Sequence, residues 1–234
     1  KNCVLRLKMS YLFPGAGLIL PCVALGASSF VMQASESVIS VCFNSSLLKY
    51  GGDIAVGAMT ILTSVMQFAM LPMQGVAQGA QPILSFNFGA KNADRVKKTF
   101  RLLLTVCLAY SVVLWGIIML FPSVFAKMFA SDASLVEFTS HALRIYCAVL
   151  FLFGIQIACQ MTFVSIGSAV CSIIVAVMRK FVLLIPLIYI LPNFIADKTN
   201  AVYTAEPVAD ALAVTFTLVL FVFRFRKEMK KLEA

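Results

Sequence analysis

The chain has 234 residues, of which 61% are hydrophobic and only 12% are charged, and its mean hydropathy is +0.96. Soluble globular domains average about 25% charged residues, so the composition excludes a soluble enzyme, a disordered tail and a disulfide-knotted secreted domain. The formal net charge is +9, and its distribution along the chain predicts membrane topology rather than a nucleic-acid partner. We expect an integral membrane protein, and because the first residue is Lys1, we expect the chain to start inside a longer one.

The sequence contains few residues in patterns that suit catalysis or metal binding. None of the seven cysteines is spaced as Cys-x-x-Cys, and most of them lie in apolar runs, where cysteine behaves as a small hydrophobic residue. The single histidine, His141, lies in a polar stretch and is expected to be solvated near the start of a helix. No catalytic triad, metal cluster or glycine-rich phosphate loop is visible. The sequence therefore predicts no enzyme, no metal and no cofactor.

Charged residues divide the chain into apolar runs that suit membrane helices, which need about 20 apolar residues each. Residues 1–17 alternate basic and apolar positions, as a cytoplasmic segment with a short interfacial helix would. A six-helix transmembrane unit over 18–225 and a basic cytoplasmic tail over 226–234 follow. The predicted spans lie near 18–48, 54–80, 101–126, 138–164, 170–195 and 205–225. In the second span, two prolines and two glycines predict an irregular cytoplasmic half: Pro72, Gly75, Gly79 and Pro82.

Basic residues set the expected orientation, because lysine and arginine accumulate in cytoplasmic loops. The segment before the first span, the loop after the second, the pair Arg179–Lys180 and the tail hold fifteen of the nineteen basic residues. These segments fall on one side, so both termini are predicted in the cytoplasm. Arg179 and Lys180 are expected to lie on a cytoplasmic extension of the fifth helix, with snorkelling as the alternative. Glu206 and Asp210 are expected at a solvated outer helix end, with a cation-attracting mouth as the alternative.

Glu36 is the sharpest functional feature of the sequence. An ionisable side chain within a membrane span marks an ion, proton or substrate path by default, and burial would move its pKa towards the range in which protons exchange at neutral pH. Gln33, Ser40 and Asn44 share its helix face. We expect these four residues to line a wet cavity that holds a cation or drug. The alternative is a protonated structural carboxyl among ordinary interhelical hydrogen bonds.

The second and fourth spans carry amides and thioethers that suit a cavity for varied amphipathic ligands. Ordinary packing is the alternative for such a methionine stripe. Pro72 interrupts the second span and is expected to act as a hinge for alternating access. The predicted cavity residues are Met66, Gln67, Met70 and Gln74 from the second span, with Gln156 and Gln160 from the fourth.

Several motifs carry a resemblance to a known family. They are residues 51–59 (GGDIAVGAM), 71–83 (LPMQGVAQGAQPI), 87–91 (NFGAK), 95–98 (RVKK), 185–192 (IPLIYILP) and 205–210 (AEPVAD). With them, essentially the whole chain resembles the multidrug and toxic compound extrusion (MATE) transporters, in particular the bacterial MepA-like branch. The stretch 71–83 is the most specific of these motifs.

The resemblance implies a fold and a function. MATE transporters have twelve helices in two six-helix lobes and export organic cations and other drugs against a Na⁺ or H⁺ gradient. The chain is similar to the carboxyl-terminal lobe, with its spans matching the seventh to twelfth helices. Glu36 falls where many members carry a seventh-helix glutamate linked to cation coupling or substrate binding. Two features depart from the family: Gln156 and Gln160 occupy the region of a tenth-helix aspartate found in one branch, and the amino-terminal lobe is absent.

Taken together, these features predict a multidrug or organic-cation antiporter lobe in the bacterial inner membrane, coupled to Na⁺ or H⁺. Its expected partners are drugs, membrane lipid, and an amino-terminal lobe or second copy that covers its polar helix faces. One alternative is a lipid-precursor flippase of the same superfamily. Another is a non-transporting, truncated membrane fragment.

Overall fold

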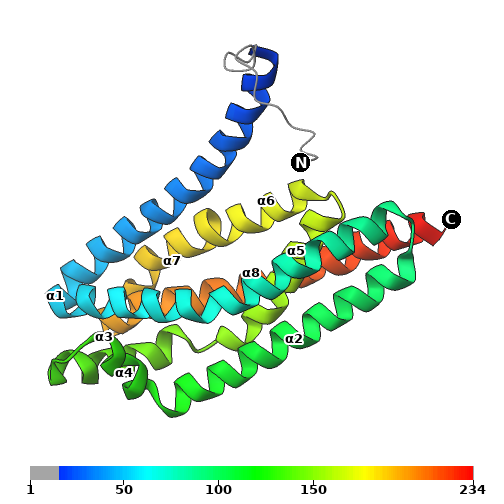
Figure 1. Cartoon of the computed structure of the whole chain (residues 1–234). Coiled ribbons are helices and arrows are strands. Elements are labelled where there is room, and N and C mark those ends of the chain that lie inside the picture. Colours follow the sequence, from blue (N-terminus) through cyan, green and yellow to red (C-terminus); the bar gives the residue numbers. More distant parts are fainter. Residues whose placement is uncertain (1–15, 234) are drawn as a thin grey trace, which may run out of the picture. The chain divides into compact units, whose positions relative to one another are not determined.

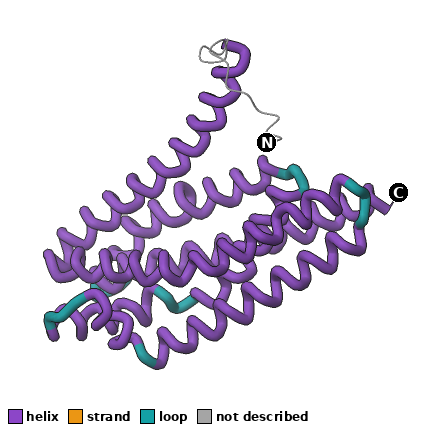
Figure 2. The backbone as a smooth tube through the Cα atoms, in the orientation of Figure 1, coloured by secondary structure: helices purple, strands orange, loops and turns teal. Residues whose placement is uncertain are grey.

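The structure is a computed structural model that describes the backbone of residues 16–233 and the side chains of residues 34–168 and 171–232. All the regular structure in this described part is helical (Figures 1 and 2), which confirms the predicted fold class. The interfacial helix predicted near the amino terminus falls on residues 1–15, outside the described part. Contacts divide the chain into residues 1–41 and 42–234. The first of these units is described by its helical backbone and, from residue 34 on, also by its side chains. The packing below is that of the second unit.

The first helix, α1 (Ala16–Gly89), breaks at Gly52, where φ is 66° and ψ is −163°. Glycine reaches this left-handed region without the steric penalty that a Cβ atom would bring. At about 1.5 Å per residue, α1 is long enough for two membrane crossings that meet at this break. Non-helical dihedral angles inside α1 occur only at Gly52. The irregular half predicted for the second span is therefore wrong, because the helix continues through Pro72 and Pro82 to Gly89.

The third predicted span is α2 (Ala93–Leu120), and a short helix, α3 (Pro122–Phe129), follows it. The fourth predicted span is not one helix. It consists of α4 (Ala133–Tyr146) and α5 (Phe153–Ser165), with the 3₁₀ turn η2 (Leu150–Leu152) between them and a bend of 46°.

Helix α2 satisfies backbone carbonyls that this bend leaves outside regular helix. The Trp115 indole Nε1–H donates to the carbonyl of Ala148 at 2.9 Å. The Ser111 hydroxyl donates to the carbonyl of Phe151, also at 2.9 Å. Irregular backbone at membrane depth is tolerated where protein groups replace the missing helical donors, so these two contacts stabilise the broken span.

The fifth predicted span contains four consecutive helical pieces: α6 (Ala169–Val177), the π-helical segment η3 (Met178–Leu184), α7 (Ile185–Ile190) and the 3₁₀ turn η4 (Leu191–Asn193). The Ile185 N–H donates to the carbonyl of Lys180, a π-type bond over five residues. Pro186 has no N–H for the carbonyl four residues earlier, and a local π turn is one way in which membrane helices adjust around a proline.

The last helix, α8 (Lys198–Glu233), extends beyond the predicted span at both ends and includes most of the residues assigned to the basic tail. Its first turn is capped by Asp197, whose Oδ1 accepts backbone N–H bonds from Thr199 and Asn200 at 3.1 Å. Asp132 caps α4 in the same way, accepting from the Leu135 N–H at 3.1 Å. The hydrogen bonds from Ser134 and Leu135 hold the pKa of the Asp132 carboxyl below its ordinary value.

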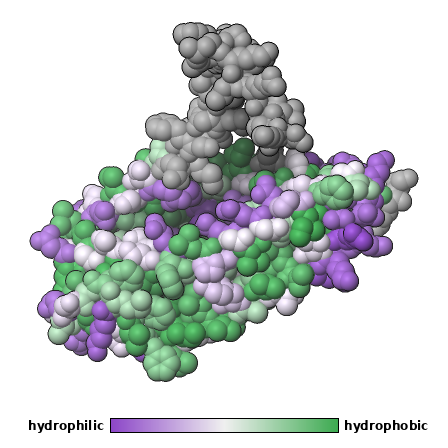
Figure 3. Space-filling view, viewed as in Figure 1, coloured by the Kyte–Doolittle hydropathy of each residue, from purple (hydrophilic) through white to green (hydrophobic). Residues whose placement is uncertain are grey.

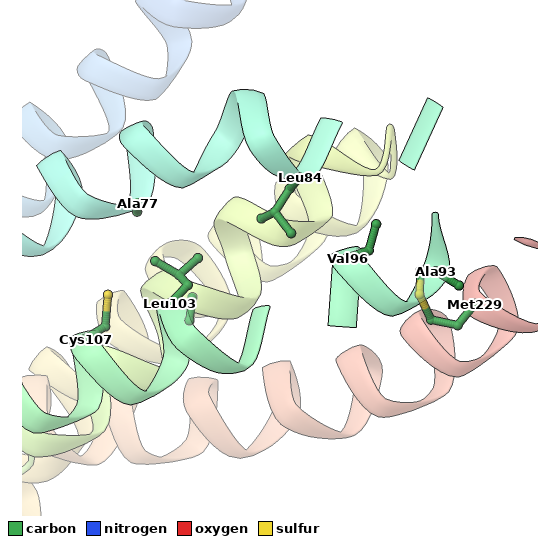
Figure 4. Packing of buried hydrophobic residues seen from close by; sticks show 8 residues of the cluster. Ala77, Leu84, Ala93, Val96, Leu103, Cys107 and Met229 are labelled. Atoms are coloured by element: carbon green, nitrogen blue, oxygen red, sulfur yellow. The ribbon is translucent and has the colours of Figure 1, made fainter. Parts of the chain in front are cut away.

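The core of residues 42–234 forms where α1, α2, α5 and α8 meet (Figure 4). Helices α2 and α5 approach closely at Gly154 of α5, where a Cβ atom would lie 2.6 Å from the Cys107 carbonyl oxygen of α2. One buried cluster joins all four helices: Ala77 and Leu84 of α1, Ala93, Val96, Leu103 and Cys107 of α2, Ala158 of α5, and Met229 of α8.

The outer surface of the helices is apolar, as a lipid-facing surface requires. Figure 3 shows hydrophobic side chains over the lower flank of the helices and hydrophilic ones towards their ends and along the upper side. In the described part, four helices are long and apolar enough to cross a membrane, or five when the bent α4–α5 pair is taken as one span. Exposed large apolar side chains on this surface include Phe68, Leu71, Leu102, Val113, Leu120 and Phe223.

Candidate functional site

An arginine and two carboxylates form a buried ion-pair cluster inside the membrane helices. The Arg179 Nη2 atom lies 3.0 Å from Glu206 Oε1, and its Nε atom lies 2.5 Å from Asp210 Oδ1. The exposed fractions of the side chains are 23% for Arg179, 8% for Glu206 and 3% for Asp210. The two carboxylates are therefore held by the guanidinium rather than by water, whereas Arg179 itself is only half-buried.

Two sequence predictions are corrected by this cluster. Arg179 was expected on a cytoplasmic extension, yet it lies near the middle of the 171–193 span, and Lys180 beside it is buried. Glu206 and Asp210 were expected at a solvated helix end, yet both are buried. The reason is that α8 packs against α4, α5, α6, α7 and η3, so its first half is enclosed by protein.

Local geometry explains why these side chains meet. On α8, Tyr203, Glu206, Pro207 and Asp210 follow the i, i+3, i+4, i+7 spacing of one helix face, and all four are buried. Arg179 lies in the π-helical segment η3, which packs against α8. Single π turns inside α-helices occur frequently at functional sites.

The helices around the cluster supply aromatic and polar neighbours. The Arg179 guanidinium carbon lies 5.1 Å from the centre of the Phe153 ring on α5, within cation–π range. Tyr146, at the end of α4, and Cys147, which follows it, are buried within electrostatic range of both carboxylates. The cluster thus joins η3 and α8 to the two halves of the broken span.

Three buried oxygens on α8, α5 and α4 are among the described side-chain atoms that have no hydrogen-bond partner, together with Asn87 Oδ1 and Arg224 Nε. The three oxygens are Asp210 Oδ2 on α8, Gln156 Oε1 on α5 and Thr139 Oγ1 on α4. All three side chains belong to buried residues, and α4 and α5 each pack against α8. Buried polar atoms are satisfied in most proteins, so each exception calls for an explanation.

The predicted cavity residues are placed individually by the structure. Glu36 and Ser40 are exposed on α1 in the first unit, and the Gln33 side chain lies outside the described residues. In the second unit, Asn44, Gln67 and Gln74 are exposed, whereas Met66, Met70 and Gln160 are half-buried and Gln156 is buried.

One contact joins a predicted cavity residue to Cys147, which follows α4 and lies within electrostatic range of Glu206 and Asp210. The Met66 Sδ atom of α1 lies 3.8 Å from Cys147 Sγ, which places one predicted cavity residue beside a neighbour of the two carboxylates. The role of these residues in binding, and that of Pro72 as a hinge, stay predictions.

Sequence reasoning missed the cluster although it carried a signal. Arg179 interrupts an apolar run of spanning length, and Glu206 and Asp210 are four residues apart around a proline in another. Ionisable residues at such depths pair with one another by default.

The single histidine, His141, is exposed, and its ring nitrogen lies 3.4 Å from the Asn200 amide. Within residues 34–168 and 171–232, no three histidine, cysteine or acidic side chains are arranged to hold a metal.

Comparison with known proteins identifies the family of the chain. Residues 28–190 match the MatE family model. The multidrug export protein MepA of Staphylococcus saprophyticus is 22% identical over 233 residues, which are 100% of this chain and 51% of that protein. MepA of Staphylococcus haemolyticus is 23% identical, over 92% of this chain and 47% of its own length. The chain thus spans about half the length of the curated relatives it matches.

Solved structures share the fold of the chain. An inward-facing multidrug resistance MATE family transporter of the MOP superfamily superposes with a TM-score of 0.85 at 19% identity, over 93% of this chain and 50% of the other. The MATE multidrug transporter DinF-BH, in complex with R6G, superposes with a TM-score of 0.77 at 32% identity, over 97% of this chain and 50% of the other.

Proposed function

Because the chain belongs to the MatE family, we propose that it is one lobe of a membrane transporter that exports drugs, organic cations among them, in exchange for Na⁺ or H⁺. One observation carries this proposal: the whole chain aligns with about half of a multidrug export protein. The match over half of solved MATE transporters supports the same division into lobes. The working transporter then pairs this lobe with an amino-terminal lobe or with a second copy.

In this proposal Glu36 is the ionisable switch of the drug cavity. It is occupied by the coupling cation in one state of the transporter and is available to a cationic drug in the other. Because both ligands draw on the same carboxylate, each lowers the affinity for the other, and this reciprocal coupling is the thermodynamic basis of exchange. Gln33, Ser40, Asn44 and the methionines and glutamines of α1 would line the cavity around it, with Gln156 and Gln160.

The test is drug efflux from bacterial cells that lack their own exporters. The chain is expressed alone, with the amino-terminal lobe of a related transporter, and in both settings as Glu36→Gln. We expect export only with the partner lobe and a loss of at least ten-fold in Glu36→Gln, because the neutral amide holds neither cation. Glu137→Gln, an exposed carboxylate on α4, is the matched control and is expected to leave export unchanged.

Two results would contradict the proposal. Export that is unchanged in Glu36→Gln would remove this residue from the coupling step. Absence of export in every pairing, despite correct membrane insertion, would favour a non-transporting membrane fragment.

A further inference from the structure

The carboxylate of Asp210 is only half satisfied by the protein around it. Its Oδ1 atom pairs with Arg179, but its Oδ2 atom is buried and has no hydrogen-bond partner. Arg179 is shared, since the same guanidinium also pairs with Glu206. A buried carboxylate oxygen without a partner is costly, so at a side chain that is 3% exposed the Oδ2 atom is a position where a bound ligand would be stabilised.

The backbone next to Asp210 offers a second oxygen. Pro207 has no N–H, so the carbonyl of Tyr203, four residues earlier in α8, loses its helical donor. Tyr203, Pro207 and Asp210 lie on the same buried face of the helix. Carbonyls freed in this way in membrane helices are groups that coordinate Na⁺ in transporters with interrupted helices.

The neighbouring helices add oxygens of the same kind. Gln156 Oε1 on α5 and Thr139 Oγ1 on α4 are also buried without a partner, and both helices pack against α8. Carboxylate, amide, hydroxyl and carbonyl oxygens are the ligands preferred by hard cations. Asp210 Oδ2, Gln156 Oε1 and Thr139 Oγ1 therefore share the chemistry of cation ligands, on three helices that pack together at α8.

We propose that Asp210 is the anchor of a binding site for one small cation, Na⁺ or H⁺, in this lobe, with Oδ2 as its contact atom and Arg179 holding Oδ1. Binding of H⁺ forms an O–H bond at Oδ2, with the proton taken from water, and binding of Na⁺ replaces hydration oxygens by protein oxygens. Either ligand neutralises Asp210 and weakens its attraction to Arg179. Occupancy thus loosens the link between η3 and α8.

This site is distinct from Glu36. Its use in transport rests on the proposed function, but cation binding to the chain does not. The ionisable groups within electrostatic range of Asp210 are Arg179 on η3, Tyr146 at the end of α4 and the adjoining Cys147, and Glu206 on α8 shares Arg179 with it. A purely structural ion-pair cluster is the competing explanation, and it predicts no specific response to a cation.

The test is cation-dependent stability of the purified full chain in lipid nanodiscs. Thermal unfolding is followed from pH 6 to 8.5 with NaCl or choline chloride at constant ionic strength. A ligand that binds only the folded state raises Tm with concentration. Fluorescence of Trp115, the single tryptophan, is a second readout, because its indole bonds to Ala148, next to Cys147.

The expected result is a saturable response that depends on Asp210. If Na⁺ binds, NaCl raises Tm and shifts Trp115 fluorescence, more strongly at high pH because protons compete less. If H⁺ binds, the same signals titrate with pH and ignore NaCl. In Asp210→Asn the affinity for the responding cation falls at least ten-fold. This variant is expected to fold, because Arg179 and Glu206 remain paired one to one.

Two variants separate this site from the others. Glu206→Gln keeps the Arg179–Asp210 pair and is expected to keep the response, and Glu36→Gln keeps it as well, whatever its effect on drug export. The proposal is overturned if the wild-type chain responds to neither cation, or if Asp210→Asn responds as the wild type does. A response lost in Glu36→Gln and kept in Asp210→Asn would assign the cation to Glu36 instead.

Discussion

Arg179 places a guanidinium near the middle of an apolar span, and Glu206 and Asp210 make that position tolerable. Each carboxylate pairs with a different nitrogen of the Arg179 guanidinium. The ammonium group of lysine does not reproduce this geometry. Removing one member of such a buried pair costs more than the pair itself contributes, because it leaves an uncompensated charge.

At this scale we expect Arg179→Gln to destabilise the chain by about 3–5 kcal/mol, the usual cost of breaking a buried pair. Thermal unfolding in detergent measures the change. The exposed Lys127→Gln is the control and is expected to unfold like the wild type. Replacing the whole cluster, as Arg179→Met with Glu206→Gln and Asp210→Asn, is expected to recover most of the loss. If Arg179→Gln unfolds at the wild-type temperature, the ion pairs contribute nothing to stability.

At the scale of elements, the packing of α5 on α2 depends on one missing side chain. A Cβ atom at position 154 would lie 2.6 Å from the Cys107 carbonyl oxygen and 2.7 Å from the Leu108 nitrogen, both backbone atoms that cannot rotate away. The bend between α4 and α5 depends on the same close packing. Ser111 and Trp115 of α2 can donate to the carbonyls of the bend only while α2 and α5 stay close.

We therefore expect Gly154→Val to lower the free energy of unfolding by about 1–3 kcal/mol or more, which is the usual cost of overpacking a core. Gly154→Ala is expected to lower it less. Thermal unfolding is again the measurement. Gly75→Ala is the matched control, since a Cβ atom there meets nothing within 4 Å, and alanine favours the helix by about 1 kcal/mol. Equal effects of Gly154→Ala and Gly75→Ala would show that the α2–α5 approach is looser than the structure has it.

The sequence indicated the elements better than their interruptions. The spans were predictable because apolar length is a local property of the chain. The π turn at Met178–Leu184 and the break between α4 and α5 were not. Both depend on donors and acceptors in other helices, which no single segment contains.

At the scale of the whole molecule, basic residues from distant segments gather at one end of the helices. A cleft of about 350 Å³ lies between the start of α2 and the end of α8. Its charged lining residues are Lys97, Arg101, Arg226 and Lys230. With Arg179 and Lys180 assigned to a membrane span, thirteen of the nineteen basic residues remain on the predicted cytoplasmic side. The orientation stays a prediction, which now rests on the remaining basic segments.

This orientation predicts the behaviour of reporter fusions. A green fluorescent protein fused after Ala234 is expected to fluoresce, because it folds in the cytoplasm, and alkaline phosphatase at the same place is expected to be inactive. Alkaline phosphatase inserted after Ser131, between α3 and α4, is expected to be active. The reverse pattern would contradict the orientation, and activity at both places would indicate mixed topology.

The sequence by itself determined the class of the molecule and its family, because composition and motif spacing can be read from the chain without its fold. It also singled out Glu36, whose role stays a prediction. Only the tertiary structure decided that Arg179, Glu206 and Asp210 meet. Arg179 lies 27 and 31 residues from its partners, and whether they face one another depends on how far the π turn rotates η3 and on which side of α8 is enclosed. Packing between helices fixes both, and with them which charges are buried and which meet water.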